Sequence, residues 1–506
     1  MKKQAYNPYL PLHVYIPDGE PHVFGDRVYV FGSHDREAGE SFCMEPYEVW
    51  SAPADDLGNW SCPGIAYRAE QDPLYDAETR NAMYAPDAVQ GNDGRYYLYY
   101  CLSGWRGKGG YASPISVAVS DRPDGPYAYL GVVRNPDGTP FLKYANFDPA
   151  VINDQGTIRL YSGTWYPMAE MSEEERKAIH ADETEAERYG KSLEHIKALR
   201  AANDAADGPH HMTLADDMLT ITSAPVRILP LRRFHTPFET DARGKGHGFF
   251  EGSSIRRING KYYFVYSSRN NHELCYATSD FPDRDFVYGG TIVSNGDIGI
   301  RGRKPEDRLN ITGTTHGGIE QINGQWYVFY HRLTHKSDYS RQGCAERITI
   351  DENGAIAQTE ITSCGLNSGP LKGEGSYPAV IACVLTNGHM PHSSNAFQKE
   401  CIPCITSGNK ERFITDITDG TLIGWRYFDL RNLSSVTLTL RGEGSGTFAI
   451  LDDLDGNVIG TLPAQTMPAW TEVTAEVSPL SGNAPLYLRF RGAGHFDLLT
   501  LTLHAK

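Results

Sequence analysis

One phrase recurs five times along the first two thirds of this 506-residue chain and restricts the folds that it can adopt. Each copy is a two-residue turn containing glycine, followed by a run in which aromatic and β-branched residues alternate with others. That pattern is typical of a tight hairpin that leads into a half-buried strand. The turn glycines are Gly25, Gly94, Gly156, Gly260 and Gly324. Such a repeat predicts an all-β fold made of consecutive antiparallel sheets.

The spacing of these glycines indicates the kind of sheet that repeats. Consecutive glycines are 62 to 69 residues apart, except for 104 residues between Gly156 and Gly260. This length suits a four-stranded blade with its loops, and radial repetition of blades avoids open sheet edges. The sequence therefore predicts a five-bladed β-propeller over residues 1–365.

The long interval has a visible source in residues 168–208. This segment is rich in Glu, Lys, Ala and Arg, begins near Ser172 as a helix N-cap, and ends at Gly208. It predicts a helical insertion between the third and fourth blades. After about residue 370 the aromatic phrase stops, and short alternating apolar runs separated by Gly, Ser and Thr predict a β-sandwich over residues 371–506.

Composition excludes several classes of partner. The formal net charge of −16 would repel a phosphate backbone, so we expect no nucleic acid partner. No stretch approaches the roughly 20 apolar residues of a membrane span, and we expect no membrane partner. The first residues, MKKQAYNPYLPLHVY, lack the apolar core of a signal peptide, and the nine scattered cysteines suit reduced thiols. These features favour a cytoplasmic protein, although a leader removed earlier would leave the same sequence.

Polar residues recur at one register of the repeat. Seven to nine residues before each turn glycine stand Asp18, Asp87, Asp148, Glu251 and His316. In a propeller this offset places them on the innermost strands, where four carboxylates and one histidine would converge on the central channel. Each alone fits a turn residue equally well, since Asp beside Pro or Gly is common in loops. Recurrence in all five copies favours a functional cluster, because like charges are costly to gather.

Glycoside hydrolysis needs one protonated carboxyl and one ionised carboxylate, and a convergent set of acids supplies both. Six short phrases of this chain match the motifs of one known family: NPYLP at Asn7, PDGEP at Asp18, YAPD at Asp87, FDPAV at Asp148, FEGSS at Glu251 and THGG at His316. With these phrases in order, residues 7 to 350 resemble glycoside hydrolase family 43, a family of five-bladed propellers.

The resemblance implies an inverting mechanism with three catalytic residues. Asp18 would be the general base on water, Glu251 the general acid, and Asp148 the residue that tunes the acid. The apolar Phe249 and Phe250 before Glu251 agree with a neutral acid. An inverting pair is expected about 6.5 to 9.5 Å apart, against about 5 Å in a retaining enzyme.

The first motif departs from the usual Ala-Asp-Pro of the family. Here it reads Pro17-Asp18-Gly19, and Glu20 is a reserve candidate for the base. The same motif is a poor match to the Asn-Asp-Pro setting that a retaining fructosidase of another five-bladed family would need.

A metal is implied only through the resemblance. In similar proteins the histidine of the THGG motif sits beside a metal, usually calcium, so His316 becomes a candidate neighbour of such an ion. A packed or hydrogen-bonded histidine is the alternative, although an oxygen-rich channel suits a hard cation. No organic cofactor is expected.

The remaining candidates concern the sugar. We assign Asp87 to substrate hydroxyls, because a carboxylate accepts hydrogen bonds from adjacent OH groups. Trp105, Trp165 and Phe250 are candidate sugar platforms, against the alternative that they only pack. Arg341 is a candidate to contact substrate or neutralise the acid cluster, against the alternative of a surface arginine.

The C-terminal region resembles a family 6 carbohydrate-binding module, in residues 412–430 and 495–503. Such a module would bind sugar through exposed aromatics, with Trp425 and Tyr427 available, or would only brace the catalytic domain; we favour bracing.

The predicted function is an exo-acting hydrolase that removes a terminal pentose or furanose from an oligosaccharide or a polysaccharide side chain. The sugars in question are α-L-arabinofuranose, β-D-xylose and the less common β-D-galactofuranose. A non-catalytic sugar-binding propeller is the alternative from another class. The sequence predicts no oligomeric state.

Overall fold

The computed structural model describes residues 2–78, 81–103, 114–142, 146–164, 208–229, 247–392, 397–480 and 482–506, with six scattered residues between 183 and 197. The predicted helical insertion at 168–208 therefore lies almost wholly outside the described residues. Strands dominate the described part, so the all-β prediction is confirmed. No helix among the described residues is long and apolar enough to cross a membrane.

Five antiparallel sheets follow one another between residues 20 and 348, each with its strands paired in chain order. The first two sheets consist of β1 (Glu20–Phe24), β2 (Arg27–Phe31) and β4 (Trp50–Pro53), and of β6 (Met83–Gln90), β7 (Tyr96–Leu102), β8 (Ser116–Ser120) and β9 (Ala128–Val132). The third consists of β10 (Ala150–Asp154), β11 (Thr157–Ser162), β12 (His210–Leu214) and β13 (Val226–Arg227). The last two consist of β14 (Phe249–Ile258), β15 (Lys261–Ser268), β16 (Glu273–Ser279) and β17 (Val287–Ser294), and of β18 (Ile319–Ile322), β19 (Gln325–Thr334) and β20 (Ser337–Ile348).

Short elements fill the connections between these sheets. They are β3 (Tyr47–Glu48), β5 (Ile65–Tyr67) and the 3-10 helices η1 (Ala69–Gln71), η5 (Asn295–Asp297), η6 (Ile300–Gly302) and η7 (Pro305–Asp307).

The repeated turns join the first two strands of each sheet. In four copies the partnered residues leave two residues between the strands, as predicted from the sequence; Asn259 and Gly260, between Ile258 and Lys261, are one such pair. The second copy differs, because Gln90 pairs with Tyr96 and the loop between them holds five residues. The glycines at these turns have positive φ, from 63° to 93°, which explains why glycine recurs there.

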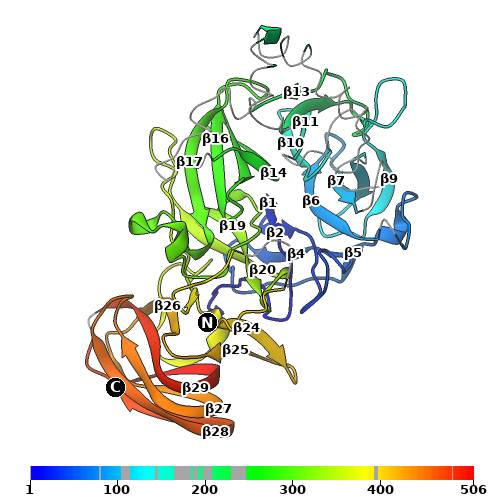
Figure 1. The fold of residues 1–506 in the computed structure, drawn as a ribbon. Helices are drawn as coiled ribbons and strands as arrows, with labels where there is room; N and C mark the ends of the chain where they lie inside the picture. The colour runs from blue at the N-terminus through cyan, green and yellow to red at the C-terminus, as the bar shows by residue number, and fades with distance from the viewer. Residues whose placement is uncertain are drawn as a thin grey trace.

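The first strands of the five sheets surround a common centre (Figure 1). Strand β1 lies beside β6 and β18, and β10 lies beside β6 and β14. A parallel bridge between Gly19 and Gly317 joins the chain just before β1 to the chain just before β18. This arrangement brings the start of the chain against the last sheet.

The C-terminal region forms one nine-stranded sheet, whose last three strands are 19 to 23 residues long. Its strands are β21 (Leu371–Lys372), β22 (Gly375–Pro378), β23 (Val384–Thr386), β24 (Cys404–Gly408), β25 (Glu411–Ile417), β26 (Leu422–Asp429), β27 (Leu433–Leu451), β28 (Val458–Glu476) and β29 (Asn483–Ala505), with the 3-10 helix η8 (Ala379–Ile381) between β22 and β23. Strand β29 pairs with β26 on one side and with β27 along most of its length. The sheet folds over a large apolar core.

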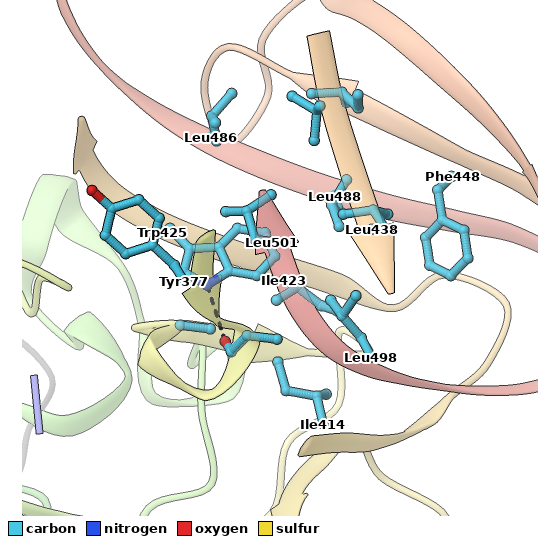
Figure 2. Packing of buried hydrophobic residues seen from close by; sticks show 14 of the residues in the cluster. Tyr377, Ile414, Ile423, Trp425, Leu438, Phe448, Leu486, Leu488, Leu498 and Leu501 are labelled. Carbon is cyan, nitrogen blue, oxygen red and sulfur yellow. Dashed lines mark hydrogen bonds between the residues drawn. The ribbon is translucent and has the colours of Figure 1, made fainter. Parts of the chain in front are cut away.

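Trp425 lies in the middle of that core (Figure 2). Its side chain is fully buried, and its indole N–H donates a hydrogen bond to the carbonyl of Ala379 at 3.0 Å. The alternative in which Trp425 is an exposed, sugar-binding aromatic is therefore wrong. Nearly every residue of β26 is buried, so this strand shows no polar face that would have marked the tryptophan as internal.

The ring of sheets and the C-terminal sheet share buried surface. One apolar cluster takes Val265 and Val328 from the ring and Val384, Leu422 and Tyr487 from the C-terminal region. A buried ion pair between Arg426 of β26 and Asp297 of η5 crosses the same boundary. The two parts therefore pack as neighbours with a common core.

Candidate active site

The polar register predicted from the sequence lies at the beginning of the inner strands. Asp18 stands two residues before β1, Asp148 two residues before β10, and His316 three residues before β18. Asp87 lies within β6 and Glu251 within β14. The structure brings Asp18, Asp148, Glu251 and His316 into electrostatic contact with one another.

Asp18 is held by an arginine from the last strand of the ring. The guanidinium Nη1 of Arg341, in β20, donates to Oδ1 of Asp18 at 2.9 Å and to Oδ2 at 3.1 Å. The ring of His331 places Nδ1 3.2 Å from Oδ1 of Asp18. Both Asp18 and Arg341 are about one-twentieth exposed, so Arg341 is not the surface arginine of the alternative interpretation.

These contacts decide the protonation state of Asp18. Burial alone would raise the pKa of its carboxyl group. The positive charge of Arg341 and the hydrogen bond with His331 outweigh burial and hold the pKa well below its ordinary value. Asp18 is therefore held as a carboxylate at neutral pH.

Glu251 has the opposite character. Burial, with a smaller contribution from the negative charge of Asp18, raises the pKa of Glu251 to about 8. Its Oε2 atom is buried and has no hydrogen-bond partner among the described residues. A carboxyl group in this state keeps its proton at neutral pH and can donate it to a substrate.

Asp148 interacts electrostatically with both Asp18 and Glu251. Its Oδ2 accepts a hydrogen bond from the backbone N–H of Gly252, the residue that follows Glu251, at 3.0 Å. Burial and the negative charges of Glu251 and Asp18 raise the pKa of Asp148 well above its ordinary value. The negative charge that Glu251 would carry therefore disfavours ionisation of Asp148.

His316 faces the same cluster. Its Nδ1 lies 3.9 Å from Oδ1 of Asp18 and 3.8 Å from Oδ2 of Asp148. Burial lowers the pKa of His316 to about 4, so the imidazole is neutral. The ring also packs against Gly252, which has φ of +77° and where a Cβ atom would lie only 3.0 Å from Cδ2 of His316. Only glycine fits this position without displacing the histidine.

Asp87 and Glu20 belong to a second group. Oδ1 of Asp87 lies 2.6 Å from Nε2 of His22, and Oδ2 accepts from the backbone N–H of Val151 at 2.6 Å. Asp87 is almost fully buried, so these contacts favour a role in joining neighbouring sheets, and its predicted contact with substrate hydroxyls stays a prediction.

Glu20, the reserve candidate for the base, forms an ion pair with Arg256. Its Oε1 accepts hydrogen bonds from Ser254 at 2.8 Å and from Arg256 at 2.7 Å. Burial raises the pKa of Glu20 to about 7. Asp18, which stays ionised, is the better base.

The structure gives little information on the candidate sugar platforms. Trp105 and Trp165 lie outside the described residues. Phe250 precedes Glu251 on β14 and is 8% exposed, which leaves a small part of its ring for a sugar.

Two further residues of the site, Asp35 and His331, are not indicated by the repeat. Asp35 accepts hydrogen bonds from Nε of Arg341 at 2.8 Å and from Nη2 at 3.0 Å, and is buried. His331 of β19 is fully buried beside Asp18. Asp35 does carry a signal, because it is a charged residue four positions after the end of the apolar strand β2, behind Gly32, Ser33 and His34.

Comparisons with known proteins point to one family. A protein-family model described as Glycosyl hydrolases family 43 matches residues 12–226, which include Asp18, Asp87 and Asp148. The chain is 40% identical to a xylosidase/arabinosidase of Thermoclostridium stercorarium over 516 residues, covering 99% of each chain.

Solved structures agree with this. A GH43_1 enzyme of Xanthomonas citri complexed with xylotriose is 25% identical, with a TM-score of 0.51 over 72% of this chain and 96% of the other. A GH43 β-xylosidase/α-arabinofuranosidase from a compost microbial metagenome, solved with xylotriose in a calcium-free form, is 25% identical, with a TM-score of 0.50 over 71% of this chain and 98% of the other.

Proposed function

The chain belongs to glycosyl hydrolases family 43 and is a glycoside hydrolase, and from this premise we propose that it releases a terminal pentose or furanose with inversion at the anomeric carbon. One observation carries the proposal. Within one buried cluster, Asp18 is held as a carboxylate while Glu251 is held as an acid. Those are the two protonation states that an inverting hydrolase needs before substrate binds.

The proposed steps follow from these states. The Asp18 carboxylate accepts a proton from a water molecule, whose oxygen attacks the anomeric carbon of the terminal sugar. Glu251 gives its proton to the glycosidic oxygen as the bond to the anomeric carbon breaks. Asp148 accepts the backbone N–H of Gly252, the residue after Glu251, and so helps to orient the acid. Arg341 prevents Asp18 from taking up a proton from solvent in the resting enzyme.

We propose α-L-arabinofuranosides and β-D-xylosides as substrates. The support is the pair of activities in the name of the relative that is 40% identical along the whole chain. A similar β-xylosidase/α-arabinofuranosidase combines the same two activities, again by its name. Both sugars are terminal pentoses of similar size, although one has a furanose and the other a pyranose ring, and we propose that one pocket accepts both.

A panel of nitrophenyl glycosides tests the substrate proposal. It contains the α-L-arabinofuranoside, the β-D-xylopyranoside and the β-D-galactofuranoside, with an α-D-glucopyranoside as control. We expect hydrolysis of the first two. The proposal would be contradicted if only the galactofuranoside is hydrolysed, or if none of the four glycosides is.

Proton NMR of the first-formed sugar tests inversion. A β-xyloside should give α-xylose before mutarotation, whereas a β-xylose product would show a retaining mechanism. On xylotriose, whose leaving group needs a proton, Asp18→Asn and Glu251→Gln should each lower kcat by about a thousandfold or more, because each removes one proton transfer. If both variants keep their activity, the two roles are wrong.

We further propose that the five sheets are the blades of a β-propeller and that residues 1–365 and 371–506 form two domains. The radial arrangement of the first strands and the bridge between Gly19 and Gly317 support the first statement. The start of the nine-stranded sheet at Leu371 supports the second. The C-terminal sheet, with its likeness to a family 6 module, would then be a β-sandwich.

Calcium near His316 is a separate proposal. Carboxylate oxygens of Asp18 and Asp148, which lie 3.9 and 3.8 Å from Nδ1 of His316, are donors of the kind that a hard cation prefers, and the histidine would stand beside the ion. Such an ion would offset part of the negative charge of the carboxyl cluster. We expect calcium chloride to raise the Tm of the wild-type protein and to leave that of His316→Ala unchanged. Equal shifts in both proteins would place the ion elsewhere.

A further inference from the structure

We propose that the C-terminal sheet positions the catalytic base, through a clamp in which Arg412 holds Glu37 and so fixes the segment that anchors Arg341. The segment is residues 35–43, between β2 and β3, and is called the anchor loop below. The inference rests on the proposed function, because it concerns the base that this function assigns to Asp18. It makes Asp35, Glu37 and Arg412 positioning residues that act through Arg341.

The anchor loop begins and ends on Arg341. Asp35 accepts from Nε of Arg341 at 2.8 Å, from Nη2 at 3.0 Å and from the backbone N–H at 3.1 Å. Arg341 uses its remaining nitrogen, Nη1, for Asp18. The guanidinium is therefore shared between the base and the anchor loop, and any shift of Asp35 is transmitted to Asp18.

The far end of the anchor loop covers the same guanidinium. The backbone N–H of Cys43 donates to Oδ1 of Asp35 at 3.0 Å and closes the loop on itself. The ring of Phe42 lies 4.7 Å from the guanidinium carbon of Arg341. This cover keeps the ion pair dry, which strengthens it.

Glu37, in the middle of the anchor loop, reaches the C-terminal sheet. Its Oε1 accepts from the hydroxyl of Tyr15 at 2.9 Å, and its Oε2 lies 2.5 Å from Nη2 of Arg412 in β25. The side chains of Glu37 and Arg412 are 24% and 17% exposed. An ion pair that is this well shielded holds its geometry better than an exposed surface pair.

Arg412 is placed for this contact by the sheet itself. It lies on β25 and pairs in register with Ser407 of β24. Strands β24 and β25 form one edge of the nine-stranded sheet. The turn between β19 and β20 contacts β24 through the backbone N–H of His335, which donates to the carbonyl of Ile405 at 2.8 Å. The edge of the C-terminal sheet thus contacts both the anchor loop and the turn that leads into β20, the strand that carries Arg341.

The test is steady-state kinetics of Arg412→Met and Glu37→Gln on a nitrophenyl β-xyloside or α-arabinofuranoside. We expect kcat to fall about tenfold with little change in KM, because misplacing a catalytic group slows the chemical step more than it weakens binding. Arg412→Lys should recover part of the loss. The double variant should be no slower than the slower single variant, since both changes break one contact.

Asp416→Asn is the matched control. Asp416 of β25 pairs with Lys336 at 2.6 Å, with side-chain exposures of 29% and 20%, and this pair also joins the C-terminal sheet to the ring. It does not touch the anchor loop. We expect Asp416→Asn to lower Tm about as much as Arg412→Met does and to leave kcat unchanged.

Two results would overturn the clamp. One is an unchanged kcat in both Arg412→Met and Glu37→Gln when the wild type is active; the other is an equal loss of kcat in the Asp416→Asn control. If Arg412→Met does not fold, Glu37→Gln decides, since it keeps the volume and changes only the charge. A wild-type protein that hydrolyses none of the glycosides would instead refute the proposed function.

Discussion

Arg341 donates hydrogen bonds to both carboxylate oxygens of Asp18, at 2.9 and 3.1 Å, from a strand that begins more than 300 residues later in the chain. The same guanidinium is bound by Asp35. A cluster with three buried carboxyls, Asp18, Asp148 and Glu251, thus contains one fixed cation, and it lies on Asp18. This asymmetry lowers the pKa of Asp18 and leaves that of Glu251 raised, which suits the proposed roles of base and acid.

Replacing Arg341 should move the acidic limb of the activity profile. In Arg341→Lys the bidentate ion pair is lost while a positive charge remains, so burial acts more strongly and the pKa of Asp18 rises. Activity needs ionised Asp18, so the acidic limb of kcat/KM against pH should shift to higher pH. At pH 5 we expect a loss of roughly a hundredfold. An acidic limb at the wild-type position would show that Arg341 does not control the base.

The wild-type enzyme should lose activity on the alkaline side. Burial raises the pKa of Glu251 to about 8, and the acid must be protonated to act. We therefore expect kcat/KM to fall above about pH 8, tenfold per pH unit in the limit. An activated aryl glycoside, whose leaving group needs no proton, should show a much weaker decline. The same decline for both kinds of substrate would contradict Glu251 as the acid.

Glu251→Gln should stabilise the protein while abolishing hydrolysis. The pKa of Glu251 is raised above the ordinary 4.5 on folding, so its contribution to stability is complete below that pH and is lost as pH rises to about 8. Glutamine cannot ionise and avoids this loss. We expect the free energy of unfolding at pH 8 to rise by about 2 kcal/mol, and to be nearly unchanged at pH 4. A variant that is less stable than wild type at pH 8 would be inconsistent with a strained carboxyl.

Gly252→Ala should damage the site without touching a catalytic atom. Gly252 has φ of +77°, and a Cβ there would meet His316 at 3.0 Å and Ser267 at 3.3 Å. We expect a loss of about 1 to 3 kcal/mol of stability and a lower kcat, because the N–H that binds Asp148 must move. Thermal unfolding and kinetics measure both effects. Gly260→Ala, at a hairpin turn with positive φ and open space, is the control: it should cost stability and leave kcat unchanged.

The repeat made the inner strands predictable from the sequence. Because the hairpin turn fixes the register, the offset from the turn glycine located Asp18, Asp148, Glu251 and His316 at the start of these strands. It located Asp87 too, but burial and its contacts with His22 and Val151 favour a different role. A register places a residue on a strand and says nothing of what it meets there.

Contacts between distant segments could not be predicted in this way. Asp35 and His331 reach the site only because the last sheet packs against the first, and no local pattern records that closure. Arg341 was considered as a candidate, yet its distance in the chain left a surface position equally open. Trp425 was misplaced for a related reason, because β26 is buried along almost its whole length and shows no alternation.

The bridge between Gly19 and Gly317 has a consequence for biosynthesis. Asp18, the proposed base, leaves the ribosome well before Arg341, which follows 323 residues later. Until that strand arrives, the first sheet has no neighbour on one side, and an isolated edge of this kind is prone to pair with other chains. Contacts of such long sequence separation also form slowly. Until the last sheet packs against the first, the proposed base has no arginine beside it, and we expect hydrolytic activity to begin only after that contact forms.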